Sequence, residues 1–200
     1  MKKLIHFLSM SLIFLLISCS QSATEEKESS DASLTVEPKE LSDVEKNLVS
    51  KTDVGMIEYF LLNGKLKEGE DLEISIEVYR NGSLETELMK TYGQIDPNLK
   101  NELISFAVRT TGDEQQFLQL VAGHTSGVSS TYQPNEVSMS SLSRLVDGKV
   151  QLELNKPLYI AMWAGTSGNT MSTGGSEDGS LPEGLDEVEV AYLYKVTLIH

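Results

Sequence analysis

Cysteine is almost absent from this sequence, since Cys19 is the only one in 200 residues. A single cysteine excludes an internal disulfide, and it leaves no thiol nucleophile or cysteine-based metal site for the rest of the chain. Basic residues are also scarce, with 16 Lys and Arg against 30 Asp and Glu and a formal net charge of −14. Such a chain repels nucleic-acid phosphates and anionic membrane surfaces, so we expect it to bind neither through charge.

Histidine occurs only three times, and only His124 lies well inside the chain. It stands two residues before Ser126, so it is a candidate general base beside a candidate nucleophile. A catalytic triad also needs an orienting acid, and the sequence has neither a G-x-S-x-G nor an S-x-x-K motif. We therefore expect His124 to be an ordinary loop residue and the protein not to be an enzyme. An anchored hydrolase acting on cell-envelope polymers or peptides is the alternative.

Metal-binding motifs are missing as well, because no H-E-x-x-H or EF-hand pattern occurs in the sequence. One acidic stretch offers oxygen ligands of the kind that calcium prefers, and the alternative is an acidic loop exposed to solvent. We expect no metal and no cofactor. The candidate calcium ligands are Ser176, Glu177, Asp178, Gly179, Asp186 and Glu187.

The N-terminus has the pattern of an export signal. Lys2 and Lys3 precede an apolar run at residues 4–17. Fourteen residues are too few for a membrane-spanning helix, which needs about 20, but they suit the apolar region of a signal peptide. The run ends in Leu16-Ile17-Ser18-Cys19, and a polar segment follows.

This N-terminal pattern resembles that of bacterial lipoproteins, whose lipobox ends in a small residue and the lipidated cysteine. The resemblance covers about 19 residues. It implies that residues 1–18 are a signal peptide cleaved before Cys19, and that Cys19 carries diacylglycerol and often a further acyl chain such as palmitate. It places the protein on the cell membrane facing outward, or on the outer membrane if the source has two. An ordinary cleaved signal peptide is the alternative.

Residues 19–53 are expected to form a mostly disordered acidic tether. Ser, Thr and Glu dominate residues 20–35, which hold too little apolar area to offset the entropy cost of ordering. Leu41, Val44 and Leu48 have helical spacing, and Ser42 with Glu45 could form a capping box. A short helix at 41–49 that packs on the domain and a continued linker are both open.

From residue 54 the apolar residues recur with a period of two, which predicts β-strands. Asn81-Gly82 predicts a hairpin, Asp96-Pro97 predicts a helical turn, and Trp163 is a candidate core residue. About eight short strands with few helices indicate an all-β domain over residues 54–200. We predict an antiparallel β-sandwich, immunoglobulin-like in architecture, with a β-barrel as the alternative. The expected strands are 56–62, 72–78, 84–91, 103–110, 116–122, 150–154, 158–164 and 188–198.

Two long connections are the expected binding regions. Residues 125–143 are rich in serine and contain Tyr132 and Met139, and residues 165–185 hold six glycines. Binding surfaces of β-sandwiches are commonly loops on a rigid scaffold, although mobile loops without a partner are equally consistent with the sequence. We therefore expect a non-catalytic module that binds a protein or an envelope component. No individual binding residue can be named from the sequence.

Overall fold

The computed structural model describes residues 33–93 and 95–200, which belong to one compact unit, Asp31–His200. The predicted signal peptide and the lipidation site Cys19 lie outside the described residues. No helix in the described part of the chain is long and apolar enough to cross a membrane.

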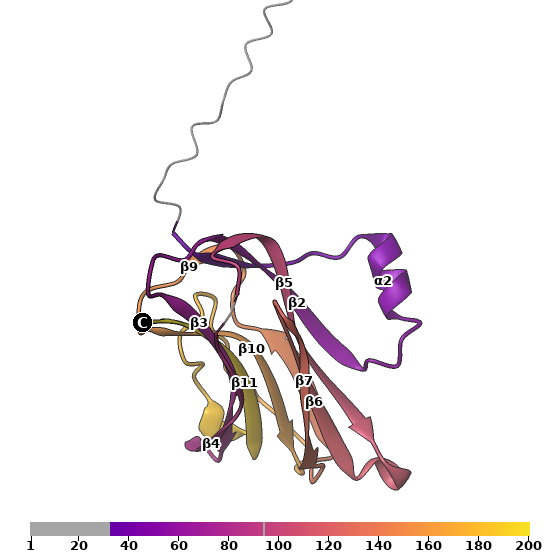
Figure 1. Ribbon diagram of the computed structural model, residues 1–200. Coiled ribbons are helices and arrows are strands. Elements are labelled where there is room, and N and C mark those ends of the chain that lie inside the picture. The colour runs from indigo at the N-terminus through magenta and orange to yellow at the C-terminus, as the bar shows by residue number, and fades with distance from the viewer. Residues whose placement is uncertain (1–32, 94) are drawn as a thin grey trace, which may run out of the picture. The chain divides into compact units, whose positions relative to one another are not determined.

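The described residues form two antiparallel β-sheets that pack face to face (Figure 1). Sheet A has six strands in the order β7-β6-β5-β2-β1-β9, and sheet B has five in the order β4-β3-β11-β10-β8. The predicted antiparallel β-sandwich is therefore confirmed, although it has eleven strands where about eight were expected. The strands are β1 (Thr35–Pro38), β2 (Met56–Lys65), β3 (Asp71–Arg80), β4 (Ser83–Thr91), β5 (Asn98–Thr111), β6 (Phe117–His124), β7 (Gly127–Pro134), β8 (Met139–Arg144), β9 (Val150–Gln151), β10 (Pro157–Thr166) and β11 (Val190–Ile199). The helical elements are α2 (Asp43–Val49) and the short 3-10 turns η1 (Asp113–Gln115) and η2 (Leu185–Glu187).

The core lies between the sheets and follows from the alternation of side chains along each strand. Trp163 is fully buried, as predicted, and its ring centroid lies 5.3 Å from that of Tyr192. Phe106 of sheet A stacks on Tyr194 of sheet B, with 5.4 Å between the ring centroids. The Phe106–Tyr194 contact joins the two sheets, whereas Trp163 and Tyr192 are neighbours on the inner face of sheet B.

The sandwich begins earlier in the chain than expected. β1 pairs with β2, and Leu34 and Val36 are buried in the core, so the expected boundary at residue 54 is wrong. A strand of four residues is too short to show a clear period of two, which explains the error. The remaining residues of the expected tether before residue 33 lie outside the described part.

Helix α2 has the capping box that the sequence suggests. The Ser42 hydroxyl accepts a bond from the Glu45 N–H, and the Glu45 carboxylate accepts one from the Ser42 N–H. The helix does not pack on the sandwich, however, because it has no buried residue, and Val44 and Leu48 are exposed. The cap rather than a hydrophobic face specifies this helix.

Other local predictions have mixed outcomes. The hairpin at Asn81-Gly82 is confirmed, with both residues in the left-handed conformation between β3 and β4. The helical turn at Asp96-Pro97 is wrong, because the Asp96 carboxylate instead accepts a bond from the Asn98 N–H at 2.8 Å and β5 begins there. The strand expected at 150–154 is reduced to the two residues of β9.

Candidate functional site

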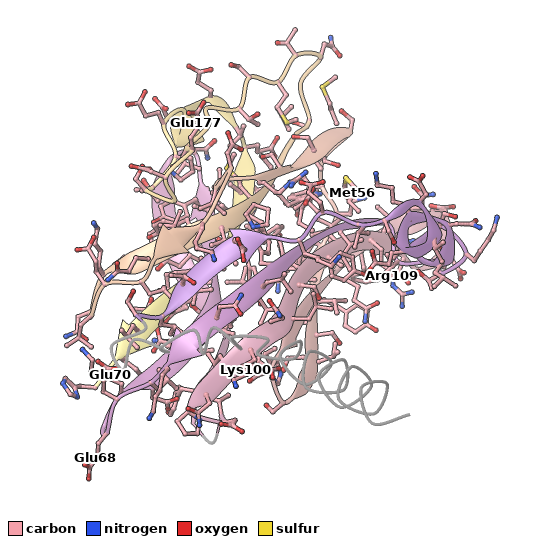
Figure 2. All side chains as sticks on the ribbon, turned by 90° about the horizontal axis from the view of Figure 1, so that it is seen from above. Met56, Glu68, Glu70, Lys100, Arg109 and Glu177 are labelled. Carbon is pink, nitrogen blue, oxygen red and sulfur yellow. The ribbon has the colours of Figure 1, made fainter. Side chains whose placement is uncertain are left out.

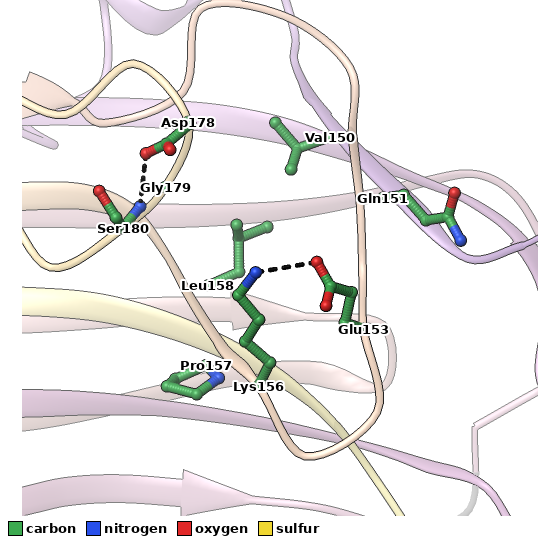
Figure 3. Close-up of a pocket in the computed structure, with 9 residues that line it drawn as sticks. All are labelled: Val150, Gln151, Glu153, Lys156, Pro157, Leu158, Asp178, Gly179 and Ser180. Carbon is green, nitrogen blue, oxygen red and sulfur yellow. Dashed lines mark hydrogen bonds and ion pairs between the residues drawn. The ribbon is translucent and has the colours of Figure 1, made fainter.

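A hollow of about 250 Å³ lies between the β9–β10 connection and the acidic loop at residues 176–180 (Figure 3). Its apolar floor comes from Val150, Pro157 and Leu158, and Glu153, Lys156, Asp178 and Ser180 provide its polar groups. The acidic loop that the sequence singles out therefore does line a depression.

The charged groups around this hollow are already engaged within the protein. The Lys156 ammonium lies 2.8 Å from the Glu153 carboxylate, and this contact raises the pKa of the lysine. The Asp178 carboxylate accepts bonds from the Ser180 N–H and the Ser176 hydroxyl, both at 3.0 Å, which lower its pKa to about 2. These contacts make Asp178 the organiser of a turn, and they leave no set of free charged groups that converges on a ligand.

The candidate calcium ligands are not brought together. In the stretches 33–93 and 95–200, no group of three His, Cys, Asp or Glu side chains is placed to hold a metal ion. Asp178 serves the turn, whereas Asp186 packs beside Gly82, where a Cβ on the glycine would lie 2.9 Å from the Asp186 Cβ. The acidic residues of this region are neighbours in sequence rather than in space.

His124 lies at the end of β6, where the chain turns into β7. Its Nδ1 lies 3.0 Å from the Ser126 hydroxyl oxygen, and its Nε2 lies 3.2 Å from the Ser129 hydroxyl oxygen. Both ring nitrogens thus contact serines, and no acid is recorded against the ring among the described residues. The adjacent hollow is only about 40 Å³. A histidine and a serine of the kind that a hydrolase needs are therefore in contact, but no acid in the described part of the chain is recorded in position to orient the histidine.

The two long connections differ in the structure. Residues 127–134 and 139–144 of the first are strands β7 and β8, so most of the expected loop at 125–143 is sheet. The error arose because consecutive Ser and Thr residues with few apolar residues between them weaken the strand pattern there. In the second connection, residues 167–184 contain no strand or helix, as expected.

This second connection covers the outer surface of sheet B. The Gly179 N–H donates to the Leu145 carbonyl, and the Gly179 carbonyl accepts from the Tyr159 N–H. Leu185 is buried in a second apolar cluster, and Met171 packs against the same cluster. Residues 167–184 are therefore tied to sheet B at Met171 and Gly179, whereas residues 167–170 are exposed to solvent.

A buried ion cluster lies on the same outer side of sheet B. Lys195 of β11 is 8% exposed, and its ammonium lies 2.7 Å from the Glu77 carboxylate and 2.6 Å from that of Glu87. Tyr79 and Tyr159 each donate a hydroxyl hydrogen bond to Glu77, at 3.0 and 2.9 Å. These contacts join β3, β4, β10 and β11, so the cluster links four strands of sheet B.

The acidity of Glu87 follows from its contacts. Burial alone would raise its pKa, but hydrogen bonds from Lys195, Lys90 and Ser75 outweigh burial and lower the pKa to about 2. Because the folded state holds this carboxylate ionised more strongly than the unfolded state does, its stabilising effect is present above about pH 4.5 and is lost as the pH falls toward 2.

We therefore expect the protein to lose stability in acid partly through Glu87. Denaturant unfolding at pH 5 and at about pH 2.5 should show a smaller acid-induced loss in Glu87→Gln than in the unaltered protein, because the glutamine cannot take up a proton. An equal loss in both proteins would contradict this role of Glu87.

The outer surface of sheet A has a different character. On β2, β5, β6 and β7, every second residue faces outward, and the residues between them face the core. The outward positions lie within residues 57–61, 103–111, 117–123 and 128–134, and Arg109 is the only charged residue that occupies one of them. Figure 2 shows Arg109 and Met56 at the α2 end of this sheet, and Glu68 and Glu70 at the other end. We call the exposed and half-buried apolar members of this set the apolar face: Ile57, Tyr59, Leu61, Leu103, Phe117, Val121, Val128 and Tyr132.

Several side chains of the apolar face are strongly exposed. Leu103 is 49% exposed, Phe117 45%, Val128 71% and Tyr132 58%. No described segment covers them, in contrast to the outer surface of sheet B. Sequence analysis missed this surface, although the nearly unbroken apolar run at residues 56–62 indicates a strand that is apolar on both faces.

Comparison with known proteins gives one match. No curated protein and no solved structure matches this chain. A family model described as the YgaN domain matches residues 35–198, which run from β1 into the last strand of the sandwich. The chain therefore belongs to the YgaN domain family.

Proposed function

We propose that this protein is a lipid-anchored bacterial surface lipoprotein whose β-sandwich binds another protein through the apolar face. Attachment rests on the lipobox at Leu16-Ile17-Ser18-Cys19. Two or more fatty chains anchor a protein stably, whereas a single chain binds a membrane only marginally. The sandwich itself supplies the binding surface, and it carries out no chemistry.

The apolar face is the observation on which the binding function rests. Monomeric soluble proteins rarely leave large contiguous apolar patches open to water, and such patches commonly mark protein interaction sites. Register places the exposed residues in neighbouring rows, because Leu103 is paired with Leu61, and Gln119 is paired with both Arg109 and Tyr132. A partner that covers this surface removes apolar area from water, which favours binding.

Charge narrows the class of partner. Residues 1–32 hold three basic and four acidic side chains, so the formal net charge of residues 33–200 is −14 plus 1, that is −13. The field of such a domain repels anionic envelope polymers and attracts a basic protein. The favoured partner is therefore a protein with an apolar contact surface and basic surroundings. This choice deepens the expectation of a protein or an envelope component.

The proposal is tested by two matched leucine substitutions. Leu103 lies on the apolar face, whereas Leu84 lies on β4 of sheet B and is similarly exposed, at 56%. We expect Leu103→Glu to weaken capture of the envelope partner by about tenfold or more, because a charge is placed in an apolar contact. Leu84→Glu should leave capture unchanged. Chemical crosslinking in intact envelopes, followed by affinity purification of the protein, measures both.

Two results would contradict the binding function. Equal capture by Leu103→Glu and by the unaltered protein would show that the apolar face is not the contact surface. An equal loss in both leucine variants would show a nonspecific effect of added charge. Both variants are exposed surface changes, so unfolding in denaturant should confirm that each remains folded.

A further inference from the structure

The edge strand β7 differs from the other edges of the two sheets. β9 has only two residues, and β4 carries Glu85, Glu87 and Lys90 and two register shifts. β8 ends at Arg144, whose guanidinium reaches Glu58 of β2 at 3.1 Å. Short length, charges, bulges and covering contacts are the usual means by which proteins block unwanted strand pairing.

β7 lacks the first three of these protections, and Pro134 at its end is its one residue without an N–H to donate. It is eight residues long, contains no charged side chain, and pairs with β6 without any register shift. It ends the strand order of sheet A, so no ladder in the described structure joins its other side. An uncharged, regular edge of this length is suited to pairing with another strand.

The hairpin geometry shows which backbone groups are free. His124 and Gly127 close a two-residue turn, and the Asn135 N–H donates to the Gln116 carbonyl at 2.8 Å. Hydrogen-bonded pairs alternate along an antiparallel ladder, so odd-numbered residues of β7 bond to β6. The N–H and C=O groups of Val128, Ser130 and Tyr132 therefore point away from the sheet. Pro134, which has no N–H, occupies an outward position of the same set.

We propose that two copies of this protein pair through β7, in antiparallel register centred on Ser130. This register is self-complementary, since Ser130 lies opposite Ser130 and each Val128 lies opposite a Tyr132 of the other copy. Aromatic and β-branched residues form favourable cross-strand pairs. Each domain carries a charge of −13, and an uncharged strand is where two such domains can meet without opposing like charges directly. The two apolar faces would become one continuous surface.

This inference goes beyond the binding function and rests on a different set of atoms, the β7 backbone. The protein used is the chain of residues 31–200, which is the compact unit and contains no cysteine. Sedimentation over a concentration series should show a monomer–dimer equilibrium. Ser130→Lys should raise the dissociation constant by about tenfold or more, because two lysines would then face each other. Ser140→Lys, the same change on exposed β8, should leave it unchanged.

Ser130→Pro provides a second variant that spares the fold. The Ser130 N–H points away from β6, so proline removes a bond of the dimer and none of the β6 ladder. We expect this variant to unfold at nearly the same denaturant concentration as the unaltered chain and to sediment as a monomer. If it misfolds, Ser130→Lys still decides the question.

Cysteine crosslinking tests the register. Opposed residues of a hydrogen-bonded pair have Cα atoms about 5.5 Å apart, within the range for a disulfide, so Ser130→Cys should form a disulfide dimer on oxidation. Val128→Cys alone should form no disulfide dimer. In this register each residue 128 lies opposite residue 132 of the other copy, so the two residues 128 are offset by four residues, about 13 Å along the strand. Mixing Val128→Cys with Tyr132→Cys should restore crosslinking.

A chain that sediments as a monomer at every concentration would overturn the proposal. So would a dimer that Ser130→Lys leaves intact. If the chain is monomeric but Ser130→Lys abolishes capture of the envelope partner, the edge belongs to that partner and not to a second copy. Loss of capture in Leu103→Glu with an intact dimer would separate the two proposals.

Discussion

Replacing Lys195 with methionine is expected to lower the free energy of unfolding by about 3–5 kcal/mol. The change keeps most of the side-chain volume but removes the charge that faces Glu77. Glu77 is 8% exposed and would retain only the hydroxyl donors of Tyr79 and Tyr159. Leaving one partner of a buried pair charged and uncompensated costs far more than the intact pair contributes. Urea unfolding followed by the fluorescence of Trp163 measures the loss.

Two further variants make the Lys195 prediction specific. Lys90 also pairs with Glu87, at 2.7 Å, but its side chain is 41% exposed, so Lys90→Met should cost far less stability than Lys195→Met. Adding Glu77→Gln to Lys195→Met should recover part of the stability, because a neutral amide then replaces the buried carboxylate. If Lys195→Met and Lys90→Met have equal costs, the ion cluster does not behave as a buried one.

Substitution of Cys19 by serine is expected to abolish lipidation completely. Serine has no thiol to accept diacylglycerol, so the lipid anchor cannot form. The precursor should remain unprocessed by the lipoprotein signal peptidase and should take up no radioactive palmitate. Metabolic labelling and the size of the precursor measure these two effects.

Ser20→Ala is the matched control for the anchor. It alters the next residue and keeps the lipobox, so labelling and processing should continue. Undiminished palmitate labelling of Cys19→Ser would refute the lipid anchor. Release of the folded domain into the medium with normal cleavage would instead favour an ordinary signal peptide.

The fold could be predicted from sequence where one face of a strand is buried. In β11, Tyr192, Tyr194 and Val196 alternate and are buried, as expected. The strand expected at 188–198 begins only at Val190, and Val188 packs in the second apolar cluster on the outer side of sheet B. Periodicity finds a strand, but it does not show which layer covers each of its faces.

The candidate site was beyond prediction because its residues come from several strands. The apolar face needs the pairing register that sets Leu61 beside Leu103 and Gln119 beside Tyr132. Sequence directed attention to the loops at 125–143 and 165–185, since loops commonly carry binding residues. Their true roles depend on long-range contacts such as that of Gly179 with Leu145 and Tyr159.

Photo-crosslinking from the apolar face in living cells tests the proposed function most directly. A benzophenone amino acid is placed at Leu103 or at Leu84 of the full-length protein, which is matured and anchored as usual. Our account predicts a crosslinked protein adduct in the membrane fraction from position 103 and none from position 84. No adduct at position 103, or the same adducts from both positions, would contradict the account.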